Sequence, residues 1–180
     1  MKSFWIHTYG CQMNAHESDK LRGMLARAGF VQGAGPDTAD IVIFQTCSIR
    51  DTAARKTLTH ISQAKKERIK NKRKQIICVI GCLSAHKQIP GVDIVLGTNQ
   101  LEVLVQKLTT KDVSDEKFSR PVGRGRGADR PRFGNFETDT SLVVSSVIIT
   151  HGCGNFCSYC IVPYVRGPEY SRDIEEIVAD

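Results

Sequence analysis

The sequence predicts an α/β fold in which a parallel sheet is sandwiched by helices. Short apolar runs alternate, along roughly the first 110 residues, with segments whose apolar residues recur at helical spacing. The run at 41–44, IVIF, is wholly apolar, which is typical of a parallel strand covered on both faces. Hydrophobic residues make up 41% of the 180 residues, so the chain can bury an ordinary core, and wholesale disorder is excluded.

Four apolar runs are expected to be the strands of this sheet: residues 3–8, 41–44, 76–80 and 94–96. Helices are expected between them, where apolar residues recur at intervals of three and four. The first helix is expected over 21–28 and ends at Gly29. The second contains Ala54, Leu58 and Ile61 on one face, and the third is expected over 99–108. Strand and helix therefore alternate, and such chains form parallel sheets with helices on both faces.

A change of composition marks the end of this first domain. Residues 119–134 contain five arginines, four glycines and two prolines, with almost nothing apolar. We therefore expect a domain at 1–118, an Arg/Gly-rich linker at 119–141 and the start of a second domain at 142–180. In that second part we expect one βα unit, with a strand at 142–149 and a helix at 173–179. A full β/α barrel needs about 200 residues or more, so we expect this domain to be incomplete here.

Positive charge is concentrated in one segment. Twenty-five Lys and Arg against 19 Asp and Glu give a net charge of +6. Residues 50–75 hold ten of the basic and two of the acidic residues, so this segment is +8 and the rest of the chain sums to −2. A basic patch suits a polyanionic partner such as nucleic acid. A long charged helix can also be a solvated face and nothing more.

Several classes of protein are excluded by what the chain contains. No stretch approaches the roughly 20 apolar residues of a membrane span, and the start MKSFWIHTYGC does not have the pattern of a secretory signal. Seven cysteines are too sparse, and odd in number, for a small disulfide-built fold. In a reducing cytosol, spaced cysteines more often bind metal or do chemistry. We therefore expect a monomeric cytoplasmic metalloprotein that contacts no membrane.

Three cysteines lie in one loop, HGCGNFCSYC, directly after the last expected strand. Cys153, Cys157 and Cys160 have the spacing Cys-x3-Cys-x2-Cys. Thiolates hold iron–sulfur clusters, and three of them can bind three irons of a four-iron cluster and leave one iron open for another ligand. A structural zinc site with His151 as its fourth ligand is the alternative.

Three more cysteines lie far apart in the sequence but in equivalent positions. Cys11, Cys47 and Cys82 each follow an expected strand, 36 and 35 residues apart. In an open parallel sheet these strand ends line the crevice in which ligands bind, so the three thiols can converge and suit a second cluster. Ordinary buried cysteines are the alternative. Cys78 lies inside the apolar run IICVI, and we expect it to be structural.

The cysteine motifs resemble those of a known family. The loop is similar to the cluster loop of radical S-adenosylmethionine enzymes, and CSYCIVPYVRGPEYSR is similar to the segment that follows it in the tRNA methylthiotransferase family. YGCQMNAHES, QTCSIR and IGCLS resemble the three cysteine motifs of that family's N-terminal domain. The chain departs from the family pattern at three places, where Asp, Asn and Ala-Gln are usual: Glu17, Gln45 and Ser84-Ala85.

The resemblance implies a ligand set for two 4Fe–4S clusters. Carried over residue by residue, it assigns an auxiliary cluster to Cys11, Cys47 and Cys82. It assigns the cluster that binds S-adenosylmethionine to Cys153, Cys157 and Cys160. Tyr159 and Arg166 are expected in the vicinity of S-adenosylmethionine, although Arg166 suits a structural ion pair equally well.

The resemblance also implies a fold and a reaction. It covers the first part of the family's length: a Rossmann- or flavodoxin-like methylthiotransferase domain and the opening of a radical-SAM β/α barrel. The reaction is insertion of a methylthio group at carbon 2 of isopentenyl-adenosine beside the anticodon of tRNA, by a sulfur-transferring transferase served by an electron donor such as a flavodoxin or ferredoxin. The alternatives are a threonylcarbamoyl-adenosine or ribosomal-protein aspartate substrate, or a non-catalytic iron–sulfur or zinc-binding fragment. Without most of the barrel, we expect this chain alone to be inactive.

Overall fold

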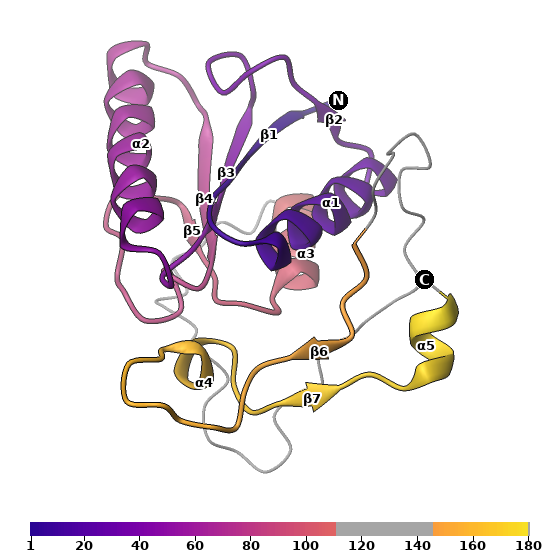
Figure 1. The fold of residues 1–180 in the computed structure, drawn as a ribbon. Helices are drawn as coiled ribbons and strands as arrows, with labels where there is room; N and C mark the ends of the chain where they lie inside the picture. The colour runs from indigo at the N-terminus through magenta and orange to yellow at the C-terminus, as the bar shows by residue number, and fades with distance from the viewer. Residues whose placement is uncertain (111–145, 180) are drawn as a thin grey trace.

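A five-stranded parallel sheet forms the centre of the first part of the chain (Figure 1). The computed structural model describes residues 1–110 and 146–179. The strand order is β2-β1-β3-β4-β5, and every neighbouring pair is parallel, which is the doubly wound order of flavodoxin-like folds. The predicted α/β fold is confirmed. The strands are β1 (Ser3–Thr8), β2 (Val31–Gln32), β3 (Ile41–Thr46), β4 (Ile76–Gly81) and β5 (Ile94–Val95).

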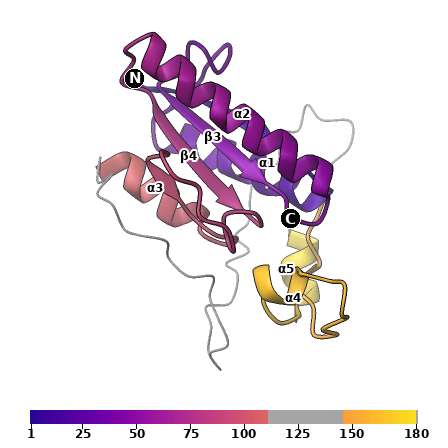
Figure 2. The same ribbon diagram turned by 90° about the vertical axis from the view of Figure 1, so that its left-hand side faces the viewer.

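Helices cover both faces of this sheet, as Figure 2 shows most clearly. The helices α1 (Gln12–Arg27) and α3 (Leu101–Thr110) lie on one face, and α2 (Asp51–Lys70) lies on the other. Each strand of the central pair is apolar and buried on both sides because both faces are covered.

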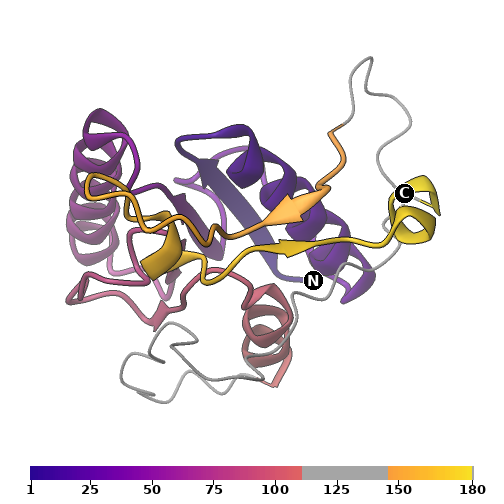
Figure 3. The ribbon, with the colours of Figure 1, turned by 60° about the horizontal axis from the view of Figure 1, so that its bottom comes forward.

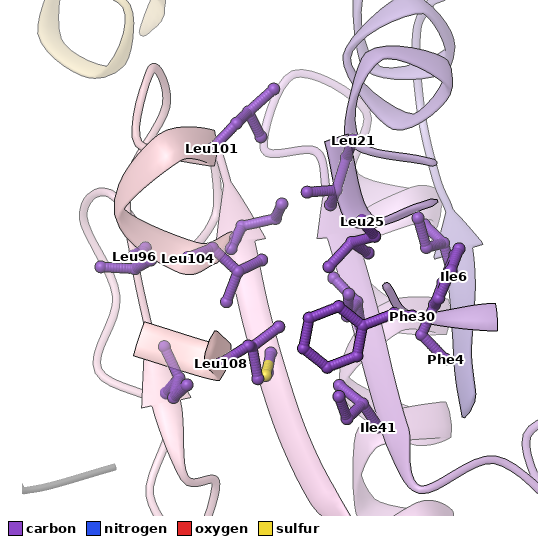
Figure 4. Packing of buried hydrophobic residues seen from close by; sticks show 14 residues of the cluster. Phe4, Ile6, Leu21, Leu25, Phe30, Ile41, Leu96, Leu101, Leu104 and Leu108 are labelled. Atoms are coloured by element: carbon purple, nitrogen blue, oxygen red, sulfur yellow. The ribbon is translucent and has the colours of Figure 1, made fainter. Parts of the chain in front are cut away.

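The larger core lies between the sheet and the pair α1 and α3 (Figure 4). Leu21 and Leu25 of α1 and Leu104 of α3 are fully buried there, which confirms the two faces predicted from helical spacing. The second core lies under α2, where Ile61 is buried against strand residues and Ala54 and Leu58 pack beside it.

Several boundaries differ from the sequence-based expectation. The helix expected over 21–28 is the C-terminal half of α1, which begins nine residues earlier, at Gln12, since residues 12–20 are mostly polar and show no apolar spacing. The helix expected from residue 99 begins at Leu101, because Asn99 has a φ of 63° and so lies outside any right-handed helix. The edge strand β2 was not predicted, since its two residues are both exposed and carry no apolar run.

The second part of the chain is a small antiparallel unit, and here one prediction was wrong. The strand expected at 142–149 is not formed over 146–149, and the two-residue strand β6 (Thr150–His151) follows instead. It pairs antiparallel with β7 (Tyr170–Ser171), and α4 (Val162–Val165) lies between them. A strand needs a hydrogen-bonding neighbour, and in this part of the structure the returning chain supplies it in place of a parallel barrel strand.

The other elements expected after residue 118 are a helix and a linker. The helix expected at 173–179 is confirmed as α5 (Ile174–Ala179). The linker at 119–141, the domain boundaries beside it and residues 142–145 of the expected strand lie outside the described residues.

The second part lies against the carboxyl edge of the sheet (Figures 1 and 3). Val165 of α4 forms a buried cluster with Cys82 and Ala85, which follow β4. Thr98 donates a hydrogen bond from its Oγ1 to the carbonyl of Val165 at 2.7 Å. The loop that carries three cysteines is therefore docked beside the ends of the strands.

Within residues 1–110 and 146–179, no helix is both long enough and apolar enough to cross a membrane.

The turn after β1 needs a glycine. Gly10 has a φ of 106°, and a Cβ atom on it would lie 2.3 Å from Cys47 Cβ and 2.6 Å from Cys47 Sγ. No side chain fits there, so the ends of β1 and β3 approach each other as closely as they do only because this residue has none. Gly29 has a similar φ of 85°, but a Cβ on it would meet nothing within 4 Å.

These two glycines give a matched test of that close approach. We expect Gly29→Ala to lower the free energy of unfolding by about 1–2 kcal/mol, the cost of left-handed backbone alone. Gly10→Ala should cost a further 1–3 kcal/mol, roughly, because it also displaces Cys47. Urea unfolding of the two variants measures both losses of unfolding free energy. Equal losses would show that the contact with Cys47 adds no cost to a side chain at residue 10.

Candidate metal centre

Cys11, Cys47 and Cys82 lie together at the carboxyl edge of the sheet. Cys11 is the N-cap of α1, three residues past the end of β1. Cys47 and Cys82 each follow the last residue of a strand, β3 and β4. Thr46 pairs with Gly81 in the β3–β4 register, and the amide of Cys82 donates to the Thr46 carbonyl at 3.1 Å. The predicted positions past the strand ends are confirmed.

The fold makes this edge a crevice. The chain leaves β1 into α1 on one face and leaves β3 into α2 on the other, although the two strands are neighbours. In doubly wound sheets ligands bind where the connections diverge in this way. Cys11 and Cys47 lie on the two sides of that switch point.

The thiols interact with one another. The thiols of Cys11 and Cys47 lie close enough to interact, and this interaction lowers the pKa of Cys47 and raises that of Cys11. Backbone N–H groups of Arg50 and Ile49, just before α2, also lower the pKa of Cys47. Burial raises the pKa of Cys82, and the nearby Arg166 opposes that effect. Because the thiolate is the form that binds metal, Cys47 is the thiol best prepared to be a ligand.

A buried arginine from the second part of the chain reaches this edge. Arg166 donates from Nη1 to Glu17 Oε1 at 2.9 Å and from Nη2 to Asn14 Oδ1 at 2.9 Å. Its side chain is 4% exposed and that of Glu17 9%. Arg166 also lies within hydrogen-bonding reach of the Cys82 thiol and 3.4 Å from His151 Nε2. The ion pair, one of the two roles that the sequence left open for Arg166, is thus present.

Asn14 connects this arginine to both strand ends. Its Nδ2 donates to the carbonyl of Tyr9 at 2.7 Å and to that of Thr46 at 2.8 Å. Tyr9 lies just after β1 and Thr46 is the last residue of β3, so Asn14 joins the two turns that carry Cys11 and Cys47. Asn14 is fully buried.

Two of the departures from the family pattern contact each other. Gln45 Nε2 donates to Glu17 Oε2 at 2.5 Å. The Glu17 carboxylate therefore accepts one hydrogen bond from Gln45 and, on its other oxygen, one from Arg166. The third departure, Ser84-Ala85, closes the turn after β4. Ser84 Oγ donates to the carbonyls of Gly81 and Leu96, and Ala85 packs against Val165.

The second cysteine set has a different environment. Cys153 and Cys160 are half-buried and Cys157 is exposed. The amide of Cys153 donates to the Gly167 carbonyl at 3.1 Å, and that of Cys160 to the Cys157 carbonyl at 2.9 Å. Tyr159, expected near S-adenosylmethionine, is 90% exposed. Backbone bonds therefore shape this loop, and Cys157 and Tyr159 are its exposed members.

His151, the alternative zinc ligand, is buried at the end of β6. Burial and the neighbouring Arg166 lower its pKa to about 4, so the ring is neutral and its Nε2 can accept a hydrogen bond from Arg166.

The chemistry of the first donor set fits an iron–sulfur cluster. Across residues 1–110 and 146–179, no three His, Cys, Asp or Glu side chains gather closely enough to hold a single metal ion. In a four-iron cluster each thiolate binds a different iron, and three neighbouring thiols from three strands provide that set. Ser48 Oγ, beside Cys47, is buried without a hydrogen-bond partner in this part of the structure and can donate to sulfur. Cys78 lies inside the core, and burial raises its pKa, as a structural thiol requires.

The basic segment divides into structural and exposed side chains. Lys65, Arg68 and Arg73 bind acceptors of the fold: the carbonyl of Pro90, the carboxylate of Asp93 and the carbonyl of Thr38. Lysines with exposed side chains continue along α2 and past its end: Lys56, Lys66, Lys70, Lys72 and Lys74.

Sequence reasoning missed Asn14 and the role of Glu17 in the site. Both lie within the motif YGCQMNAHES, in the part of α1 that precedes the helix expected over 21–28, so helical spacing did not point to them. Their partner Arg166 is about 150 residues away, and nothing in the spacing of the sequence joins them.

Known proteins match this chain along nearly its whole length. A tRNA-2-methylthio-N(6)-dimethylallyladenosine synthase of Caldicellulosiruptor saccharolyticus is 37% identical over 98% of this chain and 38% of its own length. Proteins of the same name from Clostridium botulinum and Thermodesulfovibrio yellowstonii are 36% and 34% identical, over 98% and 99% of this chain and 40% and 41% of theirs. The chain thus spans about two fifths of the length of these relatives.

These relatives bear out the resemblance to the methylthiotransferase family. A family model, described as the uncharacterized protein family UPF0004, matches residues 3–97, and this region contains Cys11, Cys47 and Cys82. Since that match covers more than half of the 180 residues, the chain belongs to the UPF0004 family.

Proposed function

We propose that this chain is the cluster-binding part of a tRNA methylthiotransferase that acts on dimethylallyl-adenosine, the nucleoside also called isopentenyl-adenosine. The observation that carries the proposal is the convergence of Cys11, Cys47 and Cys82 at the switch point of a doubly wound sheet. The names of relatives that are 34–37% identical support the substrate. The same comparison favours dimethylallyl-adenosine over threonylcarbamoyl-adenosine and over a protein aspartate.

The six motif cysteines would hold two 4Fe–4S clusters. Cys11, Cys47 and Cys82 would hold the auxiliary cluster, and Cys153, Cys157 and Cys160 the cluster that binds S-adenosylmethionine. When bound, these groups supply the one-electron and sulfur chemistry needed at an aromatic C–H, which no acid or base side chain can activate. The chain's own residues would bind and orient both groups and would shield the first of them from water.

The described residues perform those tasks in separate ways. Gly10 lets Cys11 and Cys47 approach each other, and Asn14 fixes the two turns that carry them. Val165 covers Cys82, which is fully buried, and so keeps solvent from that thiol. The exposed side of the second loop, with Tyr159, is the side on which S-adenosylmethionine would bind.

The remaining partners follow from this chemistry. The reaction consumes electrons, so we propose an electron donor such as a flavodoxin or ferredoxin, and we propose that the protein works as a monomer in the cytoplasm. The cytoplasmic proposal rests on the sequence, whose sparse and spaced cysteines suit a reducing compartment.

Iron content tests the first ligand set. After anaerobic reconstitution we expect about eight irons per chain, from two four-iron clusters. The triple variant Cys11→Ala, Cys47→Ala, Cys82→Ala should retain about half of this. Cys78→Ala is the matched control, a buried cysteine of the same sheet that should leave iron content unchanged. A triple variant that folds, by circular dichroism, and keeps all its iron would refute the assignment of these ligands.

The substrate is tested in cells that lack the gene for this chain. Their tRNA should contain dimethylallyl-adenosine without the methylthio group, as measured by mass spectrometry of nucleosides. A gene that encodes the whole enzyme should restore the modification. The same gene with Cys47→Ala should not, and neither should this 180-residue chain alone. Loss of the methylthio group from threonylcarbamoyl-adenosine instead would show that the proposed substrate is wrong.

The exposed lysines of α2 are tested by salt dependence. If they contact tRNA phosphates, the slope of log affinity against log salt for this chain should fall by about one unit for each contacting residue replaced. The variant Lys66→Gln, Lys70→Gln, Lys72→Gln, Lys74→Gln removes exposed charges and spares the structural ones. Arg27→Gln, at the far end of α1, is the control. An unchanged slope in the fourfold variant would make α2 a solvated face.

A further inference from the structure

Arg166 lies where the two cysteine sets meet. It directly follows α4, which lies beside the ends of the strands (Figure 3). Val165 of α4 packs against Cys82 and Ala85. It precedes Gly167, whose carbonyl accepts the amide of Cys153. The backbone next to Arg166 therefore contacts the second cysteine loop, while the guanidinium of Arg166 contacts the first cysteine site.

The acceptors of Arg166 are not isolated side chains. Asn14 Oδ1, which takes one bond, belongs to the residue that ties the turns of Cys11 and Cys47 together. Glu17, which takes the other, is held by Gln45, two residues before Cys47. A shift of Arg166 is thus transmitted by hydrogen bonds to both turns, and bonds of this charged and buried kind are short and directional.

We infer that Arg166 is a positioning residue that docks the second cysteine loop onto the first cysteine site and places a positive charge beside two of its thiols, those of Cys11 and Cys82. The inference deepens the proposed function and rests on it, since it assigns the charge to a site that holds a cluster. The docking itself is a property of the chain and can be measured without iron.

The docking is tested on the iron-free full chain by hydrogen exchange. We expect Arg166→Met to speed exchange at the amides of Cys153, Tyr164 and Arg166 at least tenfold, because the bonds that hold this segment to α1 are lost. Amides of β3 and β4 should keep their wild-type rates. Arg166→Lys keeps the charge but has no fork to reach both acceptors, so it should restore protection only in part.

Alkylation of Cys82 gives a second measure of docking. Cys82 is covered by Val165, so maleimide labelling of Cys82, read by mass spectrometry, should rise at least tenfold in Arg166→Met. Cys78, inside the sheet, is the internal control. Arg172→Met is the matched variant, because Arg172 is equally buried but donates to Ile148 and Glu176 of its own segment. Equal effects of the two variants, or none from Arg166→Met, would overturn the docking.

The role of the charge is tested by the reduction potential of the first cluster. If Arg166 were only structural, removing Arg166 and removing Glu17 would not shift this potential in opposite directions. The background Cys153→Ala, Cys157→Ala, Cys160→Ala leaves only the first cluster to be reconstituted. Arg166→Met should then shift the potential in the negative direction, and Glu17→Gln in the positive direction, although both break the same ion pair. Arg166→Lys should stay near the unsubstituted background.

The outcomes separate the two proposals. Shifts of the same sign, or no shift in either variant, would overturn the electrostatic role of Arg166. A chain that takes up no iron at all would refute the proposed function, and the exchange and labelling results would still decide whether Arg166 docks the loop.

Discussion

The parallel register of β1, β3 and β4 is the constraint on which the candidate site depends. Thr8 lies opposite Gln45, and Thr46 opposite Gly81, so the three strands end at the same level of the sheet. Cysteines that are 36 and 35 residues apart in the sequence become neighbours for this reason alone. A slip of one residue in either pair would turn the strand's side chains to the opposite face and carry a thiol away from the others. The two cores that cover the sheet fix the register and thereby the site.

The sequence predicted those parts of the structure that depend on local patterns. Strand positions followed from apolar runs, and the place of Cys11, Cys47 and Cys82 followed from where the runs end. The strand expected at 142–149 failed over 146–149, because an apolar run does not show which partner it will pair with, and Thr150 and His151 found one in the returning chain. The bonds of Arg166 to Glu17 and Asn14 could not be predicted, since pairing over 149 and 152 residues leaves no periodic trace.

The buried ion pair of Arg166 and Glu17 has a different structural effect from the ion pairs on the surface. Arg55 and Asp51 pair one turn apart on exposed α2, an arrangement worth about 0.3–0.5 kcal/mol. Arg166 and Glu17 both leave water almost completely, at a cost of several kcal/mol per ion, roughly, which their attraction offsets only when geometry and further hydrogen bonds are good. Asn14 and Gln45 provide those bonds. Such a pair adds little to stability, but it permits one arrangement of the two segments and penalises others.

The contact between Glu17 and Gln45 makes their lengths interdependent. The family that this chain resembles usually has Asp and Asn at these positions, so both side chains here are one methylene longer. Gln45 is buried and its Nε2 has Glu17 as acceptor, while the other carboxylate oxygen binds Arg166. Shortening one side chain alone would leave a buried donor or acceptor unpaired, at about 1–3 kcal/mol. Shortening Glu17 would also withdraw the carboxylate from Arg166, so residue 17 and residue 45 are matched to each other and to the position of the docked loop.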